Sequence, residues 1–201
     1  MLPLAWAALV AAARIPGPAD AALVDATHFV PDAVIDLRYA TSSNFLGRAV
    51  YPPGARCLLL RPVAERLARA ADRLRARGLR LRVYDCYRPL AVQREMWRLV
   101  PRKGFVADPA KGSNHNRGAA VDVGLSAPDG SEVELPTPFD AFGPRARAGA
   151  TAGVSATARR NRDLLRAAME AERFRVNRSE WWHFDAPEAR GAPIRDVPLE
   201  P

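Results

Sequence analysis

The chain has 201 residues, of which 48% are hydrophobic and 26% charged, values typical of one globular domain and not of a long disordered chain. Thirty basic residues against 22 acidic ones give a net charge of +8. The histidines are His28, His115 and His183 and the cysteines Cys57 and Cys86, which excludes zinc-finger arrays, cysteine-rich scaffolds and histidine-rich tracts.

The first segment of the chain resembles a secretory leader. Residues 2–13 form an apolar run that is too short to span a bilayer but matches the hydrophobic part of a signal peptide. Ala19-Asp20-Ala21 has the A-x-A cleavage pattern. No basic residue precedes the run, so a wrongly assigned start or an alanine-rich helix without a targeting role is the alternative. We expect a signal peptide over 1–21, a functional domain over 22–201 and no membrane span.

These expectations favour a periplasmic or secreted protein, with a cytoplasmic one as the alternative. In an exported protein, Cys57 and Cys86 can form a disulfide across the helix and strand that they flank. Two separate buried thiols are the alternative.

The elements expected along the chain do not follow the regular strand–helix–strand repeat of a parallel sheet. Alternating or continuous apolar runs predict strands, and apolar residues three or four apart predict helices. The first helix begins at Arg61-Pro62, because proline suits the first turn, and Gly78 ends it. The patterns predict strands over 34–39, 79–84, 119–125 and 180–185, and helices over 61–78, 89–99 and 156–172. We expect a single α+β domain, with a central antiparallel sheet flanked by helices.

Arginine carries almost all of the positive charge, since lysine occurs only at 103 and 111. A nucleic acid, a membrane surface or an acidic polymer is one explanation of such an excess. The arginines instead alternate with apolar residues along helical stretches, as at Arg66, Arg69 and Arg73, which is typical of a solvated helix face. Because no recognised nucleic-acid-binding motif accompanies them, we expect no nucleic-acid partner.

A first histidine–carboxylate pair consists of His115, in the glycine-flanked segment 113–118, and Asp122, inside an apolar strand. An ionised carboxylate in that setting is unfavourable by on the order of several kcal/mol unless it is paired or binds a metal. A metal held by both residues meets this requirement. For this segment alone, backbone N–H groups that donate to Asp122 beside a histidine are an equally good explanation.

Glu180 and His183 form a second pair, three residues apart among aromatic side chains. Zinc hydrolases need three ligands from His, Asp or Glu, a position open to water, and a carboxylate that takes the water's proton. His115, Asp122 and His183 complete such a ligand set and leave Glu180 as the base, its pKa raised by the apolar surroundings. Residues three apart face opposite sides of a regular strand, so this prediction requires a bulge or bend. An aromatic core strand with an ordinary histidine hydrogen bond is the alternative.

Arg88 lies where a predicted strand ends and a helix begins, a position from which a guanidinium can point at an oxyanion. His28 has no acidic or cysteine neighbour suited to metal ligation, so we expect it to be structural.

Two of these segments carry a resemblance to a known family. S-x-H-x-x-G-x-A-x-D at 113–122, followed by E-x-W-H at 180–183, resembles the zinc signature of the D-alanyl-D-alanine metallopeptidases, to which the hedgehog domain is related in fold. Further motifs resemble the D-Ala-D-Ala dipeptidases of the vancomycin-resistance type, over about residues 28 to 190. They lie at 36–41, 44–47, 85–89 and 139–140.

The resemblance implies one Zn²⁺ per chain, bound by His115, Asp122 and His183. It implies Glu180 as the general base and Arg88 as the residue that stabilises the tetrahedral oxyanion. The activity implied is zinc-dependent hydrolysis of the dipeptide D-alanyl-D-alanine in cell-wall peptide metabolism.

The resemblance also implies a substrate pocket. Tyr39, Ser113 and Asp140 match positions around the free amino end of the substrate, with Asp140 as the partner of its ammonium group. The chain departs from the family before Phe139, because residues 135–138 lack the expected Met-Gly. Tyr51 is a candidate for a second tyrosine of this pocket.

Other functions fit parts of the same pattern. A D,D-carboxypeptidase that acts on longer peptidoglycan stem peptides shares the zinc chemistry but needs an open groove and no ammonium anchor. A non-catalytic zinc-stabilised domain and a basic polymer-binding domain are further alternatives. Glu180 and Arg88 favour an enzyme, because a purely structural zinc site needs neither.

Overall fold

A mixed sheet forms the centre of the protein in the computed structural model, which describes residues 21–101 and 106–200. The predicted signal peptide, residues 1–21, lies outside the described residues except for Ala21. The strands are β1 Leu23–Asp25, β2 Val34–Ile35, β3 Leu58–Leu60, β4 Arg80–Asp85, β5 Ala120–Ser126, β6 Arg175–Asn177 and β7 Glu180–Asp185, and the helices are α1 Arg61–Arg75, α2 Leu90–Leu99 and α3 Ala156–Ala171.

The strands of the central sheet follow the order β2-β4-β5-β7-β6. All neighbours pair antiparallel except β2 and β4, which are parallel, and β1 and β3 form a separate antiparallel pair. The predicted α+β fold with a central antiparallel sheet is confirmed, with one parallel pair at its edge.

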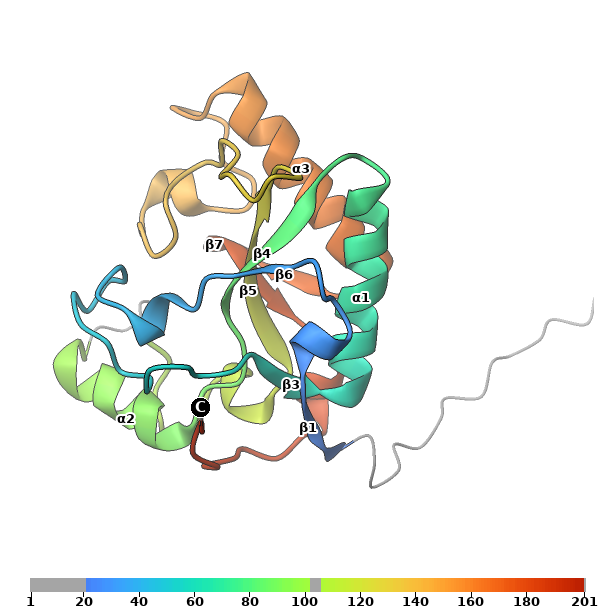
Figure 1. Cartoon of the computed structure of the whole chain (residues 1–201). Coiled ribbons are helices and arrows are strands. Elements are labelled where there is room, and N and C mark those ends of the chain that lie inside the picture. Colours follow the sequence, from blue (N-terminus) through green and yellow to red (C-terminus); the bar gives the residue numbers. More distant parts are fainter. Residues whose placement is uncertain (1–20, 102–105, 201) are drawn as a thin grey trace, which may run out of the picture.

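Helices α1 and α3 lie side by side against the sheet, whereas α2 lies on the other side of the molecule with the segment that precedes β3 (Figure 1). The two long helices begin where the sequence favours it: Pro62 occupies the first turn of α1, and the Ser155 side chain accepts from the backbone N–H of Ala158 at the start of α3. The inward residues of α1, such as Leu67 and Leu74, are buried in the core.

The arginines of α1 do more than face solvent. Arg69 and Arg73 donate to Glu172, just beyond α3, at 2.7 and 2.8 Å, and Arg66 donates to Glu188 at 3.0 Å. Arg69 and Arg73 are half exposed, as the sequence predicted, but their charges also tie α1 to the segments after α3 and β7.

Several boundaries differ from the sequence prediction. The strand expected over 34–39 is limited to Val34–Ile35 and is followed by the 3₁₀ turn Arg38–Ala40. The three-residue strands β1, β3 and β6 were not predicted, because alternation needs a longer run to be recognised. Cys57 and Cys86 form a disulfide, so the first of the two alternatives for these residues holds. In the described part of the chain no helix combines the length and apolar character that crossing a membrane requires.

Candidate active site

Two of the predicted metal ligands lie opposite each other on neighbouring strands. Asp122 in β5 pairs with His183 in β7, and Asp85 at the end of β4 pairs with Asp122 from the other side. Side chains of directly opposed residues project from the same face of a sheet, so the topology gathers three polar groups at one level. All of β5 is buried, which encloses Asp122 as the sequence predicted.

His115 reaches this point from the 3₁₀ turn His115–Arg117, which leads into β5. Gly118 ends the turn with a φ of +67°, and a Cβ at this position would lie 2.5 Å from Leu23 Cδ2. The left-handed conformation therefore favours glycine here, and a Cβ would also force the end of the Leu23 side chain to move. The glycine of the motif thus fixes the direction in which the chain enters β5.

Glu180 and His183 converge because β7 departs from regular pairing with β6. Asn177 pairs with Glu180, but the preceding residue of β6, Val176, pairs with Phe184, which leaves residues 181–183 without partners in β6. Such a bulge redirects side chains that a regular strand would place on opposite faces. Glu180 and His183 line the same cavity, so the irregularity that their spacing requires is confirmed.

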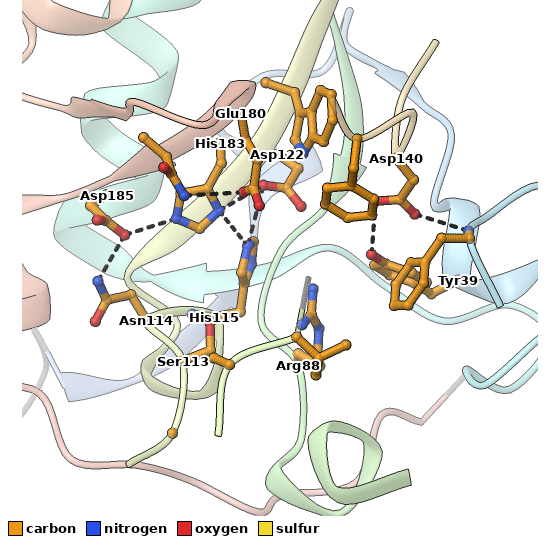
Figure 2. A pocket seen from close by; sticks show the side chains of 17 residues that line it. Tyr39, Arg88, Ser113, Asn114, His115, Asp122, Asp140, Glu180, His183 and Asp185 are labelled. Atoms are coloured by element: carbon orange, nitrogen blue, oxygen red, sulfur yellow. Dashed lines mark hydrogen bonds and ion pairs between the residues drawn. The ribbon is translucent and has the colours of Figure 1, made fainter. Parts of the chain in front are cut away.

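The predicted ligand atoms lie within contact distance of one another (Figure 2). His183 Nδ1 is 3.0 Å from Asp122 Oδ1 and 3.1 Å from His115 Nε2, and His115 Nε2 is 3.3 Å from Asp122 Oδ1. A tetrahedral zinc site with bonds of about 2.0 Å separates its ligand atoms by about 3.3 Å. These three residues are the one group in the described part of the chain with the spacing of a metal site.

The hydrogen bonds of the two imidazoles assign their protons to the outer nitrogens. His115 Nδ1 lies 2.7 Å from the carbonyl oxygen of Cys86, which can only accept, so this nitrogen donates. His183 Nε2 likewise donates to the Asp185 carboxylate at 3.0 Å. His115 Nε2 and His183 Nδ1 then carry lone pairs and face the carboxylate of Asp122. With both imidazoles neutral, three electron-pair donors converge and need a cation between them, a proton or a metal ion, so the residues present fit a metal ion.

The electrostatics of the cluster agree with this requirement for positive charge. Burial raises the pKa of Asp122, but the neighbouring His115 and His183 outweigh it and hold this pKa below its ordinary value. Burial lowers the pKa of His183, whereas hydrogen bonds to Asp122 and Asp185 raise it well above its ordinary value. The lowered pKa of Asp122 and the raised pKa of His183 both show that the cluster favours added positive charge between the three side chains.

Glu180 borders the cluster, and its carboxylate is held by one neighbour. The side-chain amide of Asn177 donates to Glu180 Oε2 at 3.2 Å. Burial raises the pKa of Glu180, although the adjacent His183 opposes the shift. The predicted direction of this shift is confirmed, and it brings the carboxyl group closer to the range in which it exchanges protons at neutral pH.

Arg88 is buried beside the cluster and is partly committed to protein partners. Its Nη2 and Nε donate to Asp85 Oδ2 at 2.6 and 3.2 Å, and its Nη1 donates to Gln93 Oε1 at 2.9 Å. A guanidinium has five N–H donors, so two remain for a ligand in the cavity. Tyr51 donates to Asp85 at 2.6 Å and does not line the cavity, so it supports Arg88 from behind rather than forming part of the pocket wall.

A second buried carboxylate lies on the other side of the cavity (Figure 2). Asp140 Oδ1 accepts from the Tyr39 hydroxyl at 3.2 Å, and its Oδ2 accepts from the Phe45 amide at 3.3 Å. Asp140 has a φ of +61°, a strained conformation for a residue other than glycine. Burial raises its pKa to about 8, and the negative charge of Asp122 adds to the shift. Neither partner is a cation, so this carboxyl group is suited to a positively charged ligand.

One cavity of about 380 Å³ collects the site residues that the sequence predicted, apart from the candidate Tyr51. The Ser113 hydroxyl, which accepts from the His115 amide at 3.2 Å, lies on its wall. His28 is exposed in the 3₁₀ turn Ala26–His28 and does not line it. The predicted residues that line it are Tyr39, Arg88, Ser113, His115, Asp122, Asp140, Glu180 and His183.

Sequence reasoning missed the residues that hold the ligands and Arg88 in place. Asp185 orients His183 and itself accepts from the Asn114 side chain at 2.8 Å. Its position two residues after His183, on the same side of a strand, is a signal that could have found it. Asp85 is fully buried at the end of β4. This strand alternates arginine with apolar residues, so its sequence does not single out a buried carboxylate as the apolar run around Asp122 does.

A metal ion held by these three donors would keep a fourth position for a ligand from the cavity, which Glu180 and Arg88 also line. A fold and site of this kind define a hydrolytic metallopeptidase.

The chain belongs to the D-Ala-D-Ala dipeptidase family, whose model matches residues 19–198. It is 38% identical over 172 residues to the D-alanyl-D-alanine dipeptidase of Escherichia coli, an alignment that covers 86% of this chain and 88% of that protein. It is 32% identical over 173 residues to the D-alanyl-D-alanine dipeptidases of Enterococcus faecium and Enterococcus faecalis, covering 74% of this chain and 83% of each relative.

Proposed function

We propose that this protein is a zinc-dependent dipeptidase that hydrolyses free D-alanyl-D-alanine to two molecules of D-alanine. Membership of the family and the D-alanyl-D-alanine dipeptidase activity for which the relatives are named support the reaction. The observation that carries the substrate assignment is Asp140, a buried carboxyl group in the same cavity as the metal ligands. It is hydrogen-bonded by Tyr39 and Phe45 and forms no ion pair with any residue that the structure describes.

His115, Asp122 and His183 would hold the zinc ion, one per chain, through the three atoms that converge in the cavity. A zinc ion bound there supplies Lewis acidity and makes water a stronger acid. Asp185 and the Cys86 carbonyl keep both imidazoles in the tautomer that presents a lone pair to the metal.

Glu180 is the general base in this proposal. Its carboxylate takes a proton from the attacking water and then gives it to the amino group that leaves when the peptide bond breaks. The raised pKa of Glu180 suits both transfers, because a carboxyl group with an ordinary pKa would hold that proton too weakly at neutral pH.

Arg88 has two free N–H donors for the oxygen of the scissile carbonyl, which gains negative charge in the transition state. Asp85 and Gln93 hold the guanidinium in place before substrate arrives. A preformed donor of this kind requires little reorganisation during the reaction, which is the source of its catalytic effect.

Asp140 binds the ammonium group of the dipeptide and so selects for a free amino end. A stem peptide carries an acyl chain instead of that ammonium group, so it cannot form the ion pair with Asp140 that the dipeptide forms. Asp140 therefore favours the dipeptide over the longer substrates of a D,D-carboxypeptidase.

The test compares two substrates with the zinc-loaded protein. We expect release of D-alanine from D-Ala-D-Ala with a kcat/KM at least about 30-fold above that for an N-acylated pentapeptide ending in D-Ala-D-Ala, because one buried ion pair is worth about 2–5 kcal/mol. A preference for the acylated peptide would identify a D,D-carboxypeptidase and overturn the proposal. Absence of hydrolysis of both substrates would overturn the enzymatic assignment to D-Ala-D-Ala chemistry.

We also propose that the protein acts outside the cytoplasm. The Cys57–Cys86 disulfide supports this location, because disulfides persist in exported proteins and are rare in the reducing cytoplasm. N-terminal sequencing of the protein from its host tests the proposal. Cleavage after residue 21, with the mature chain outside the cytoplasm, is the expected result, and an intact N-terminus in the cytoplasmic fraction would contradict it.

A further inference from the structure

The Cys57–Cys86 disulfide lies directly behind the active site. Cys57 immediately precedes β3, and Cys86 immediately follows β4. Both residues are 1% exposed, so the bond is shielded from reductants in the folded protein. The position and burial of this bond indicate a permanent structural connection rather than a redox switch.

The peptide groups of Cys86 contact both halves of the catalytic machinery. Its carbonyl oxygen accepts from His115 Nδ1 at 2.7 Å, the bond that aims the other ring nitrogen at the metal position. Its amide donates to Asp85 Oδ1 at 2.9 Å, while Asp85 Oδ2 accepts from Arg88 at 2.6 Å. A shift of this one residue therefore moves a metal ligand and the oxyanion arginine together.

The regular sheet does not by itself fix Cys86. The pairing of β4 with β5 ends at Asp85 and Asp122, after a register shift between Val83 and Asp85. Beyond this point, Tyr87 donates its amide to the Leu58 carbonyl at 2.8 Å, which links the chain after β4 to β3. The disulfide joins the same two segments one residue earlier in each, and it is the covalent part of this connection.

We propose that the Cys57–Cys86 disulfide is a positioning element of the active site, which sets zinc affinity and turnover by fixing the Cys86 peptide beneath His115 and Arg88. The proposal rests on the proposed function for its effect on turnover, and on the ligand cluster alone for its effect on zinc affinity. It goes beyond that function by assigning a role in catalysis to a bond that contacts neither substrate nor metal.

The test removes the bond in three ways: Cys57→Ala, Cys86→Ala and the double variant. Zinc affinity is measured by competition with a chromophoric chelator, and kcat and KM are measured with D-Ala-D-Ala. We expect about tenfold weaker zinc binding and a kcat about tenfold lower, because loss of an outer partner of a ligand typically has effects of 10- to 100-fold. KM should change less than twofold, since Asp140 and Tyr39 lie on the other side of the cavity. The double variant should equal the single ones, because each removes the same bond.

Leu74→Ala is the matched control for a general loss of stability. Leu74 is 1% exposed in the last turn of α1, near the end of the sheet where β4 begins, whereas Cys86 follows the end of β4. We expect its melting temperature to fall as in the cysteine variants and its zinc affinity to remain that of the parent. Cys57→Val, which fills the space of the sulfur, replaces Cys57→Ala if the latter does not fold.

The proposal is overturned if the variants without the bond bind zinc within twofold of the parent, or if Leu74→Ala weakens zinc binding as much as they do. A purely stabilising disulfide would give the first result, with a lower melting temperature and an unchanged zinc affinity. If the parent binds zinc but does not hydrolyse D-Ala-D-Ala, the proposed function fails, while the comparison of zinc affinities still decides the role of the disulfide.

Discussion

Asp140 offers the sharpest test of how the protein selects its substrate. Asp140→Asn keeps the size of the side chain and one oxygen that accepts from the Phe45 amide, and its amide NH2 can donate to the Tyr39 hydroxyl, but it removes the charge that faces the substrate ammonium group. The carboxyl group is buried, so the lost interaction is a desolvated ion pair, worth about 2–4 kcal/mol. We expect kcat/KM for D-Ala-D-Ala to fall roughly 30- to 10³-fold.

The loss of kcat/KM in Asp140→Asn should depend on pH, because the parent must ionise Asp140 to bind the ammonium group. Its pKa is raised to about 8, so below pH 8 the carboxyl group of the free protein is mostly neutral and must release a proton when the ammonium group binds. This release costs about 1.4 kcal/mol for each pH unit below 8. The ratio of kcat/KM between parent and variant should therefore fall about tenfold for each pH unit well below 8. Glu180 titrates in both proteins and cancels in the ratio.

Initial rates of D-alanine release between pH 6 and 9 measure this ratio, with Asp129→Asn as the control. Asp129 is an exposed carboxylate outside the cavity lining, so its variant should keep the activity of the parent at every pH. A ratio for Asp140→Asn that does not vary with pH, or a loss below about threefold at pH 8, would refute Asp140 as the ammonium partner.

Other predictions follow from the same geometry. Asp140→Asn should stabilise the metal-free protein: its folded pKa of about 8 lies above the unfolded value, so the parent loses stability as pH rises from about 4 to 8, by about 4 kcal/mol at pH 7. The melting temperatures of the metal-free parent and of Asp140→Asn should therefore coincide at pH 4, and that of the parent should fall below that of the variant towards pH 8. Glu180→Ala should retain zinc by elemental analysis and lose at least about 10²-fold in kcat; full activity would remove Glu180 from the mechanism. His115→Ala should lose stoichiometric zinc, and unchanged metal content would exclude His115 as a ligand. Asp185→Asn should weaken zinc binding about 10- to 100-fold by chelator competition, and parent-like affinity would exclude its orienting role.

The parts of the fold that follow from local sequence were predictable. The inward stripe of α1, with Pro62 at its start, is a local pattern, and so are the buried run of β5 and the aromatic run of β7. The short strands β1, β3 and β6 are stabilised by pairing with distant segments, as Leu23 with Leu60 shows, and three residues carry too little local pattern to indicate this.

The candidate site also has residues that local sequence predicts and residues that it does not. His115, Asp122, Glu180 and His183 occur in two short motifs, and the spacing of Glu180 and His183 was sufficient to require a bulge. The residues that hold them in place depend on contacts between strands. The opposition of Asp85 and Asp122 depends on the register of β4 and β5, which no local pattern of either strand specifies.

The central claim is that one zinc ion in this cavity makes the protein a D-Ala-D-Ala dipeptidase. Titration of the metal-free protein with zinc, with D-alanine release recorded at each addition, tests it most directly. Activity should rise in proportion to added zinc and reach its plateau at one equivalent per chain, because His115, Asp122 and His183 form a single site. Full activity without metal, or a plateau at two equivalents, would contradict the account.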